Sequence, residues 1–114
     1  MKINLVYGDE FWLRLHSLAE KAQRRIFVFS AYIGRTDYVN VYKFKPSNVP
    51  VAFMCRNDSG FKPDKDIFLV DCDIFHGKIY VVDDVVLIGS QNFYNANKQG
   101  EFSVEFECEG SAES

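Results

Sequence analysis

Two apolar runs separated by an acidic pair occur in the segment His76-Gly77-Lys78-Ile79-Tyr80-Val81-Val82-Asp83-Asp84-Val85-Val86-Leu87-Ile88-Gly89-Ser90-Gln91-Asn92. This pattern predicts two antiparallel strands joined by a tight turn. Because side chains alternate between the faces of a strand, His76 and Lys78 are expected on one face. The returning strand brings Ser90 and Asn92 back to the same end. An imidazole, an ammonium, a hydroxyl and an amide gathered in this way suit a tetrahedral anion such as phosphate.

Each of these residues also has a more ordinary explanation. A single histidine in a strand is more often a hydrogen-bonded structural residue, and a single lysine is usually solvated. The spacing of the whole set favours a functional interpretation, because it resembles the HKD motif of the phospholipase D superfamily. The matching residues are His76, Lys78, Asp83, Gly89, Ser90 and Asn92.

The resemblance implies an α/β fold in which a mixed β-sheet is flanked by helices, as in a trimmed phospholipase D-like sandwich. It also implies phosphodiester chemistry that uses two histidines. One attacks phosphorus to form a phosphohistidine, and the other protonates the leaving oxygen and later activates water. His76, Lys78, Ser90 and Asn92 take catalytic positions in this scheme, and Asp83 and Gly89 support the motif.

The motif departs from the family pattern at the hairpin turn. Five residues, 84–88, separate Asp83 from Gly89, one fewer than is usual in the family. Either Asp83 or Asp84 therefore matches the family aspartate, whose part we interpret as supporting the hairpin. Relatives also carry an acidic residue after Gly-Ser-x-Asn that orients the imidazole. Glu101 is the best match, with Glu105 as a rival and a solvated strand end as the alternative.

The order of patterns along the chain predicts a small α/β layer. We expect strands over 3–7, 26–33, 49–55 and 67–70, and an amphipathic helix over 10–25 with Asp9 as its N-cap. The unbroken apolar run of 26–33 predicts a central strand covered on both faces. Residues 34–50 are poorly patterned, and Pro46 and Pro50 argue against a long helix there. Segments 34–50 and 56–66 look shortened relative to the family.

The final strand shows clear alternation. Phe102, Val104, Phe106 and Cys108 alternate with Ser103, Glu105, Glu107 and Glu109. This pattern predicts that the phenylalanine side of the strand is buried and that the glutamate side is solvated.

Length and composition favour a single domain. The chain has 114 residues, of which 47% are hydrophobic, so residues 1–109 are expected to form one domain with a frayed tail over 110–114. No apolar run approaches the ~20 residues of a membrane span, and no signal peptide is recognisable, so we expect a cytoplasmic protein with no membrane contact. Cys55, Cys72 and Cys108 lack metal-ligand spacing and are expected to be buried thiols. No metal or other cofactor is expected.

Charge is neutral evidence on nucleic acid. The net charge is −3, but residues 1–100 hold 13 basic and 11 acidic side chains, or +2, and the other five acids follow. Basic residues interleaved with aromatics could contact a nucleic-acid backbone, although solvated loops explain them equally well. These candidates are Lys43, Lys45, Arg56, Lys62 and Lys65.

The histidine count sets the expected assembly. The chain has two histidines, and His16 lies on the predicted helix without a motif lysine, which favours a helix-surface or packing role. A second catalytic histidine must then come from another chain, and a two-fold homodimer would supply another copy of His76. The leading hypothesis is a metal-independent homodimeric DNA endonuclease, either by itself or as one piece of a larger nuclease assembly. The alternatives are a lipid or small-molecule phosphodiester hydrolase, or a non-catalytic nucleic-acid-binding or assembly module.

Overall fold

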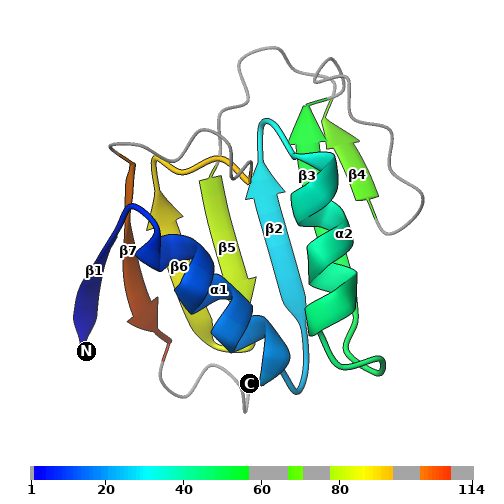
Figure 1. Ribbon diagram of the computed structural model, residues 1–114, viewed down its shortest axis with the longest axis horizontal. Coiled ribbons are helices and arrows are strands. Elements are labelled where there is room, and N and C mark those ends of the chain that lie inside the picture. The colour runs from blue at the N-terminus through cyan, green and yellow to red at the C-terminus, as the bar shows by residue number, and fades with distance from the viewer. Residues whose placement is uncertain (1, 57–66, 71–77, 94–100, 109–114) are drawn as a thin grey trace.

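The computed structural model describes residues 2–56, 67–70, 78–93 and 101–108. Within these ranges the chain forms one mixed sheet of seven strands and two helices (Figure 1). The elements are β1 (Ile3–Tyr7), α1 (Glu10–Glu20), β2 (Ile26–Ser30), α2 (Arg35–Phe44), β3 (Val51–Arg56), β4 (Ile67–Val70), β5 (Lys78–Val82), β6 (Val85–Gly89) and β7 (Phe102–Glu107). This architecture confirms the predicted fold class.

The strand order is β1-β7-β6-β5-β2-β3-β4. Strands β2, β3 and β4 are parallel, whereas β5 is antiparallel to β2 and forms the predicted hairpin with β6. Strand β7 pairs with β6, and β1 closes that edge of the sheet. The hairpin therefore occupies the middle of the sheet, where its two ends are held by neighbours on both sides.

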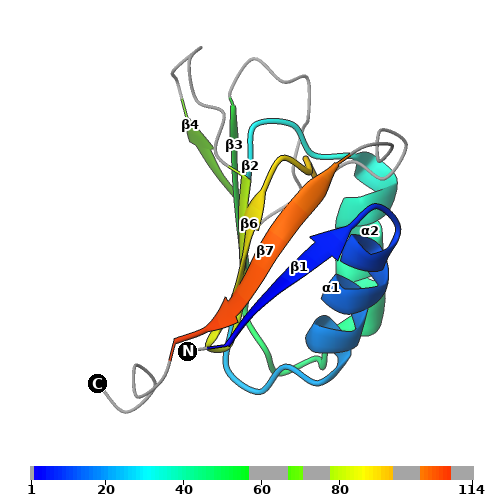
Figure 2. The ribbon, with the colours of Figure 1, turned by 90° about the vertical axis from the view of Figure 1, so that its left-hand side faces the viewer.

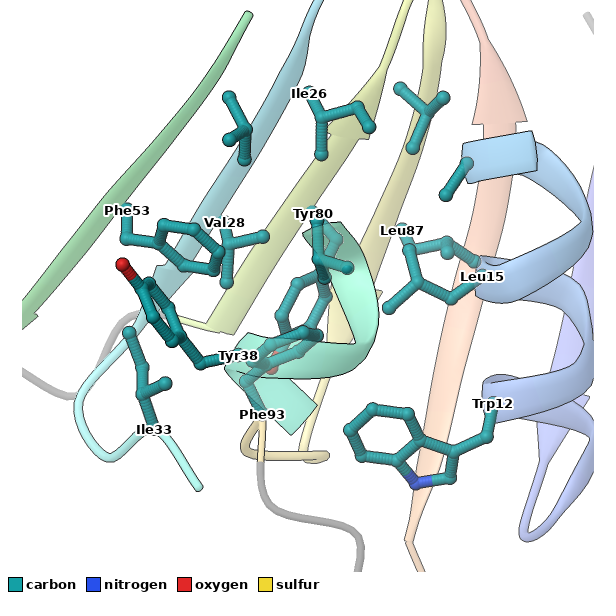
Figure 3. Close-up of a cluster of buried hydrophobic side chains, with 14 of the residues drawn as sticks. Trp12, Leu15, Ile26, Val28, Ile33, Tyr38, Phe53, Tyr80, Leu87 and Phe93 are labelled. Atoms are coloured by element: carbon teal, nitrogen blue, oxygen red, sulfur yellow. The ribbon is translucent and has the colours of Figure 1, made fainter. Parts of the chain in front are cut away.

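The core lies between the sheet and the helices (Figure 3). Trp12 and Leu15 of α1 and Tyr38 of α2 pack against Phe53 and Tyr80 of the sheet. Each large apolar side chain buried in this way contributes roughly 1.5–3 kcal/mol. This core fixes both helices against the same strands that carry the motif.

Helix α1 ends earlier than predicted. It was expected to continue to Arg25, but its last residue is Glu20. The backbone N–H groups of Gln23, Arg24 and Arg25 donate instead to the carboxylate of Asp83, at 2.8–3.3 Å. A contact from the distant hairpin thus ends the helix before its amphipathic pattern does.

No helix was predicted within residues 34–50, where a ten-residue helix, α2, spans Arg35–Phe44. Tyr38 and Val41, one turn apart, are buried against the sheet. Pro46 follows the helix, and Lys45 before it has the extended backbone that a following proline favours. The proline ends this helix and does not prevent it.

Strand boundaries differ from the predictions by a few residues. Strand β2 stops at Ser30, after which Ile33 makes only an isolated bridge with Phe93. Strand β3 begins at Val51 and reaches Arg56. Strand β4 has the predicted bounds.

The buried face of β7 is the opposite of the predicted one. Ser103 and Glu105 are buried, whereas Phe102 is 48% exposed. Two features explain the reversal. Arg14 of α1 binds the carboxylate of Glu105 at 2.6 and 2.7 Å. Gly89 has no side chain, so Ser103 can lie close against it. Side-chain alternation identified the two faces of the strand but not which one meets the helices.

Both helices lie on one side of the sheet (Figure 2). The prediction that β2 is covered on both faces was therefore wrong, since Phe27 and Phe29 on its other face are only half-buried. Figure 2 shows no helix on that second side in the described part of the chain.

The cysteines partly match expectation. Cys55 is buried, Cys108 is half-buried, and Cys72 lies outside the described residues. Within the described ranges, neither helix is long and apolar enough to cross a membrane.

Candidate functional site

Four of the motif residues gather at one end of the hairpin, which we call the motif edge: Lys78, Gly89, Ser90 and Asn92. Lys78 begins β5 and is paired with Ser30, the last residue of β2. Gly89 ends β6 beside them, and Ser90 and Asn92 follow it directly. The predicted return of the hairpin thus brings Lys78, Ser90 and Asn92 to the same edge.

Ser30 joins β2 to the motif. Its fully buried hydroxyl donates to the carbonyl oxygen of Tyr32 at 2.7 Å and accepts the N–H of Phe93 at 2.9 Å. The same oxygen lies 3.3 Å from Oδ1 of Asn92. One side chain therefore fixes the backbone after Asn92 and contacts its amide oxygen.

Buried aromatic side chains also hold the segment that contains Asn92. The hydroxyl of Tyr80 donates to the carbonyl of Gln91 at 2.5 Å, and the Tyr80 and Phe93 rings lie 5.9 Å apart. Burial raises the pKa of the Tyr80 hydroxyl, and the negative charge of Asp37 acts in the same direction. Tyr80 thus stays a neutral hydrogen-bond donor, which suits a positioning role.

Ser90 is bound to β7. Its N–H donates to the Phe102 carbonyl at 2.9 Å, and its hydroxyl accepts the Phe102 N–H at 3.1 Å. This places Glu101, the residue before Phe102, beside the motif edge. Its backbone carbonyl accepts the N–H of Gly8 at 2.9 Å.

The rival carboxylate, Glu105, lies further along β7. It is paired with Leu87, two residues before Gly89 in β6. Its buried carboxylate is held by Arg14 in a two-bond ion pair. This engagement favours Glu101 as the carboxylate for the site.

Asp83 and Asp84 lie at the opposite end of the hairpin. Asp83 adopts a left-handed φ of 53° in the turn, and Asp84 pairs with Arg24 at 2.7 Å and with Arg25 at 3.5 Å. Although partial burial opposes the effect, the N–H groups of Arg24, Gln23 and Arg25 hold the pKa of Asp83 below its usual value. The two aspartates anchor the turn to the end of α1 and are remote from Lys78.

Gly89 is required by close packing of two strands. A Cβ at this position would lie 2.2 Å from the Phe102 carbonyl oxygen and 2.5 Å from Cα of Ser103. Both are backbone atoms, so neither can move aside without separating β6 from β7.

The structure does not unite the candidate nucleic-acid residues. Lys43 and Lys45 lie at the carboxyl end of α2, and the ammonium of Lys45 donates to the carbonyls of Pro46 and Val49. Arg56 ends β3 at the other end of the helix layer, where it is mostly buried against Tyr32. Arg56 and the two lysines therefore lie at opposite ends of α2, which runs antiparallel to β3. Lys62 and Lys65 lie outside the described residues, as does His76.

His16 packs between the helices. Its ring centroid lies 4.8 Å from that of Phe44 and 6.0 Å from that of Trp12. Burial lowers its pKa, against the raising effect of Asp37 and Glu20. Of the two predicted roles, helix surface or packing, these contacts favour packing.

Three contributors to this edge were missed from the sequence: Ser30, Asp37 and Tyr80. A small polar residue at the end of an apolar strand could have drawn attention to Ser30. Asp37 is buried in the first turn of an unpredicted helix, so no signal was available for it.

No family model matches the chain, and no curated protein matches it. Several solved structures are similar to it. NucT from Helicobacter pylori is 13% identical, with 98% of this chain and 87% of that chain covered and a TM-score of 0.70. Nuc from Salmonella typhimurium, a phospholipase D family member, is 18% identical, with 93% and 82% covered and a TM-score of 0.65. The archaeal chromatin protein TrmBL2, described as DNA-binding, is 13% identical, with 94% and 44% covered and a TM-score of 0.65.

The chain therefore has the fold of the phospholipase D superfamily. At these identities the likeness is one of fold, and the chemistry has to be argued from the residues at the motif edge.

Proposed function

We propose that the protein is a metal-independent phosphodiesterase that cleaves DNA through a covalent phosphohistidine. The observation that carries the proposal is the convergence of Lys78, Ser90 and Asn92 on one edge of the sheet, with Ser30 and Tyr80 holding the segment that contains Asn92. His76 precedes Lys78 by two residues, so its Cα is within about 7 Å of the Cα of Lys78.

The chemistry of the motif supports this assignment. The imidazole of His76 attacks phosphorus and the bond to the leaving oxygen breaks, while Lys78 and the amide of Asn92 stabilise charge on the other phosphate oxygens. Ser90 fixes the loop to β7, and Glu101 orients the imidazole. Water then attacks phosphorus with the help of a base, which breaks the phosphorus–nitrogen bond and restores His76.

The leaving oxygen needs a proton, and the later water needs a base. His16 is a poor candidate for either task, since its ring is packed against Phe44 and Trp12. A second copy of His76, brought by a two-fold axis at the motif edge, would supply both. We therefore propose a site shared by two subunits.

A DNA-binding module without catalysis is the second candidate, and the likeness to TrmBL2 favours it. It predicts DNA binding that survives loss of His76 and no strand cleavage. When lipid vesicles are included, the same experiment also distinguishes a lipid substrate from DNA.

The test is to incubate purified protein in EDTA with labelled plasmid, single-stranded DNA and phosphatidylcholine vesicles. We expect DNA cleavage by wild type and none by His76→Ala. Lys78→Ala should lose activity on the order of a hundredfold or more, and the matched control Lys21→Ala, at an exposed lysine that follows α1, should keep its activity. Vesicle hydrolysis without DNA cleavage would contradict the nuclease, and retained DNA binding without any cleavage would favour the module.

A further inference from the structure

An exposed aromatic side chain lies at the motif edge. Residues 31–34 connect β2 to α2 at the end of the sheet where β5 starts and β6 ends (Figure 1). Within this connection Tyr32 is 41% exposed, whereas Ala31 before it and Ile33 after it are buried. The side chain of Tyr32 is therefore available to a ligand bound at this edge.

Ser30 fixes the position of Tyr32 relative to the proposed site. The Ser30 hydroxyl donates to the carbonyl oxygen of Tyr32 at 2.7 Å and lies 3.3 Å from Oδ1 of Asn92, so these two oxygens are at most about 6 Å apart. In addition, Ile33 and Phe93 form a parallel bridge. The residues before them, Tyr32 and Asn92, are therefore neighbours as well.

A buried cation holds the side chain of Tyr32. Arg56, the last residue of β3, is 9% exposed. Its guanidinium carbon lies 5.5 Å from the centroid of the Tyr32 ring, and its Nη1 donates to the Tyr32 hydroxyl at 3.3 Å. The backbone N–H of Arg56 donates to the carbonyl oxygen of Ala31 at 3.2 Å. An aromatic ring that is already held in place loses little conformational entropy when a ligand stacks on it.

Cations reach the motif edge from both strands that flank β2. Lys78 begins β5 and is paired with Ser30, and Arg56 ends β3 beside Ala31. Two cations and an exposed aromatic ring suit a ligand that carries both negative charge and flat aromatic groups. A nucleic-acid strand, with its phosphates and bases, has this combination.

We propose that Tyr32 stacks on a nucleobase of the nucleotide next to the phosphate bound at the motif edge. Every base has a π face, so stacking of this kind does not require a particular sequence. The base has to leave its own stack to reach the ring, which makes an unpaired nucleotide the better ligand. The inference rests on the proposed function to the extent that a nucleic-acid phosphate binds beside Lys78 and Asn92.

The test compares a labelled single-stranded oligonucleotide with an abasic oligonucleotide of the same length, which has the same phosphates and no bases. Cleavage is measured as kcat/KM in EDTA for wild type, Tyr32→Ala and Tyr32→Phe, with thermal unfolding to check that each protein folds. Kd is measured by fluorescence anisotropy in the His76→Ala background, where the DNA should stay intact. Phe44→Ala is the matched control, because Phe44 is 39% exposed at the opposite end of α2.

The ratio of the two affinities is the decisive quantity. We expect Tyr32 and Tyr32→Phe proteins to bind the oligonucleotide with bases on the order of tenfold more tightly than the abasic one. Tyr32→Ala should bind both equally, and Phe44→Ala should keep the wild-type ratio. Equal affinities in the protein with Tyr32 would overturn the inference. So would a folded Tyr32→Ala protein with the wild-type ratio, because Tyr32 would then only cover Arg56.

The two readouts separate this inference from the proposed function. Cleavage that is equal for both oligonucleotides, with equal affinities, would overturn the stacking and support the phosphodiesterase. Base-dependent binding without any cleavage would support the stacking and overturn the phosphodiesterase. Failure to bind or cleave either oligonucleotide would overturn both.

Discussion

The Ser30 hydroxyl lies 3.3 Å from Oδ1 of Asn92 and accepts the N–H of the next residue, Phe93. The residue that ends a core strand thus sets the position of a motif residue distant from it in the sequence. This relationship links the stability of the fold to the geometry of the proposed site.

Ser30→Ala should lower both stability and activity. It leaves the buried N–H of Phe93 without its acceptor, which costs about 1–3 kcal/mol, and it releases the backbone next to Asn92. Denaturant unfolding and DNA cleavage measure the two effects. Ser47→Ala, at an exposed loop serine, is the control, and a Ser30→Ala protein with wild-type stability and activity would refute the assignment.

Gly89→Ala should cost far more stability than Gly8→Ala. The new Cβ at Gly89 meets backbone at 2.2 and 2.5 Å, whereas at Gly8 it meets nothing within 4 Å. Gly8 has a φ of +61°, so its replacement costs about 1–2 kcal/mol for the left-handed backbone alone. We expect a loss of about 3 kcal/mol or more at Gly89. Equal unfolding midpoints for the two variants would contradict the close approach of β6 and β7.

Asp83→Asn should destabilise the protein at neutral pH and not at strongly acidic pH. The folded pKa of Asp83 is depressed, so its charge stabilises the fold above its unfolded pKa of about 3.9. This contribution is lost as the pH falls through the folded value. The test is the unfolding midpoint of wild type and variant across that range, with the exposed Glu10→Gln as control. If the difference in unfolding midpoint between wild type and Asp83→Asn grew as the pH fell, it would contradict the depressed pKa of Asp83.

Local signals predicted the part of the fold that local interactions determine. The alternation and acidic turn of residues 78–89 were enough to place the hairpin, and its pairing brought Lys78 towards Ser90 and Asn92. The end of α1 depends on Asp83, and the buried side of β7 depends on Arg14, which is 91 residues from Glu105. Helix α2 has polar residues at half of its positions, including a buried Asp37, so its packing against the sheet, and not its own pattern, stabilises it. Ser30 joined the site only through strand pairing that the sequence did not reveal.

Mixing His76→Ala protein with wild type should reduce activity more steeply than dilution. If two copies of His76 form one site, each heterodimer lacks either the nucleophile or the acid. The measurement is the cleavage rate after subunit exchange, with His16→Phe protein as a control that should leave the rate unchanged. A rate that falls only in proportion to the wild-type fraction would indicate that each subunit forms a complete site by itself.

The most direct test of a phosphohistidine mechanism is a covalent trap. Protein is mixed with a short labelled single-stranded DNA in EDTA, quenched in denaturant at alkaline pH, and analysed by intact-mass spectrometry and peptide mapping. We predict a DNA adduct on His76 that is lost in His76→Ala and kept in His16→Phe. Cleavage that leaves no adduct and requires magnesium would contradict the account.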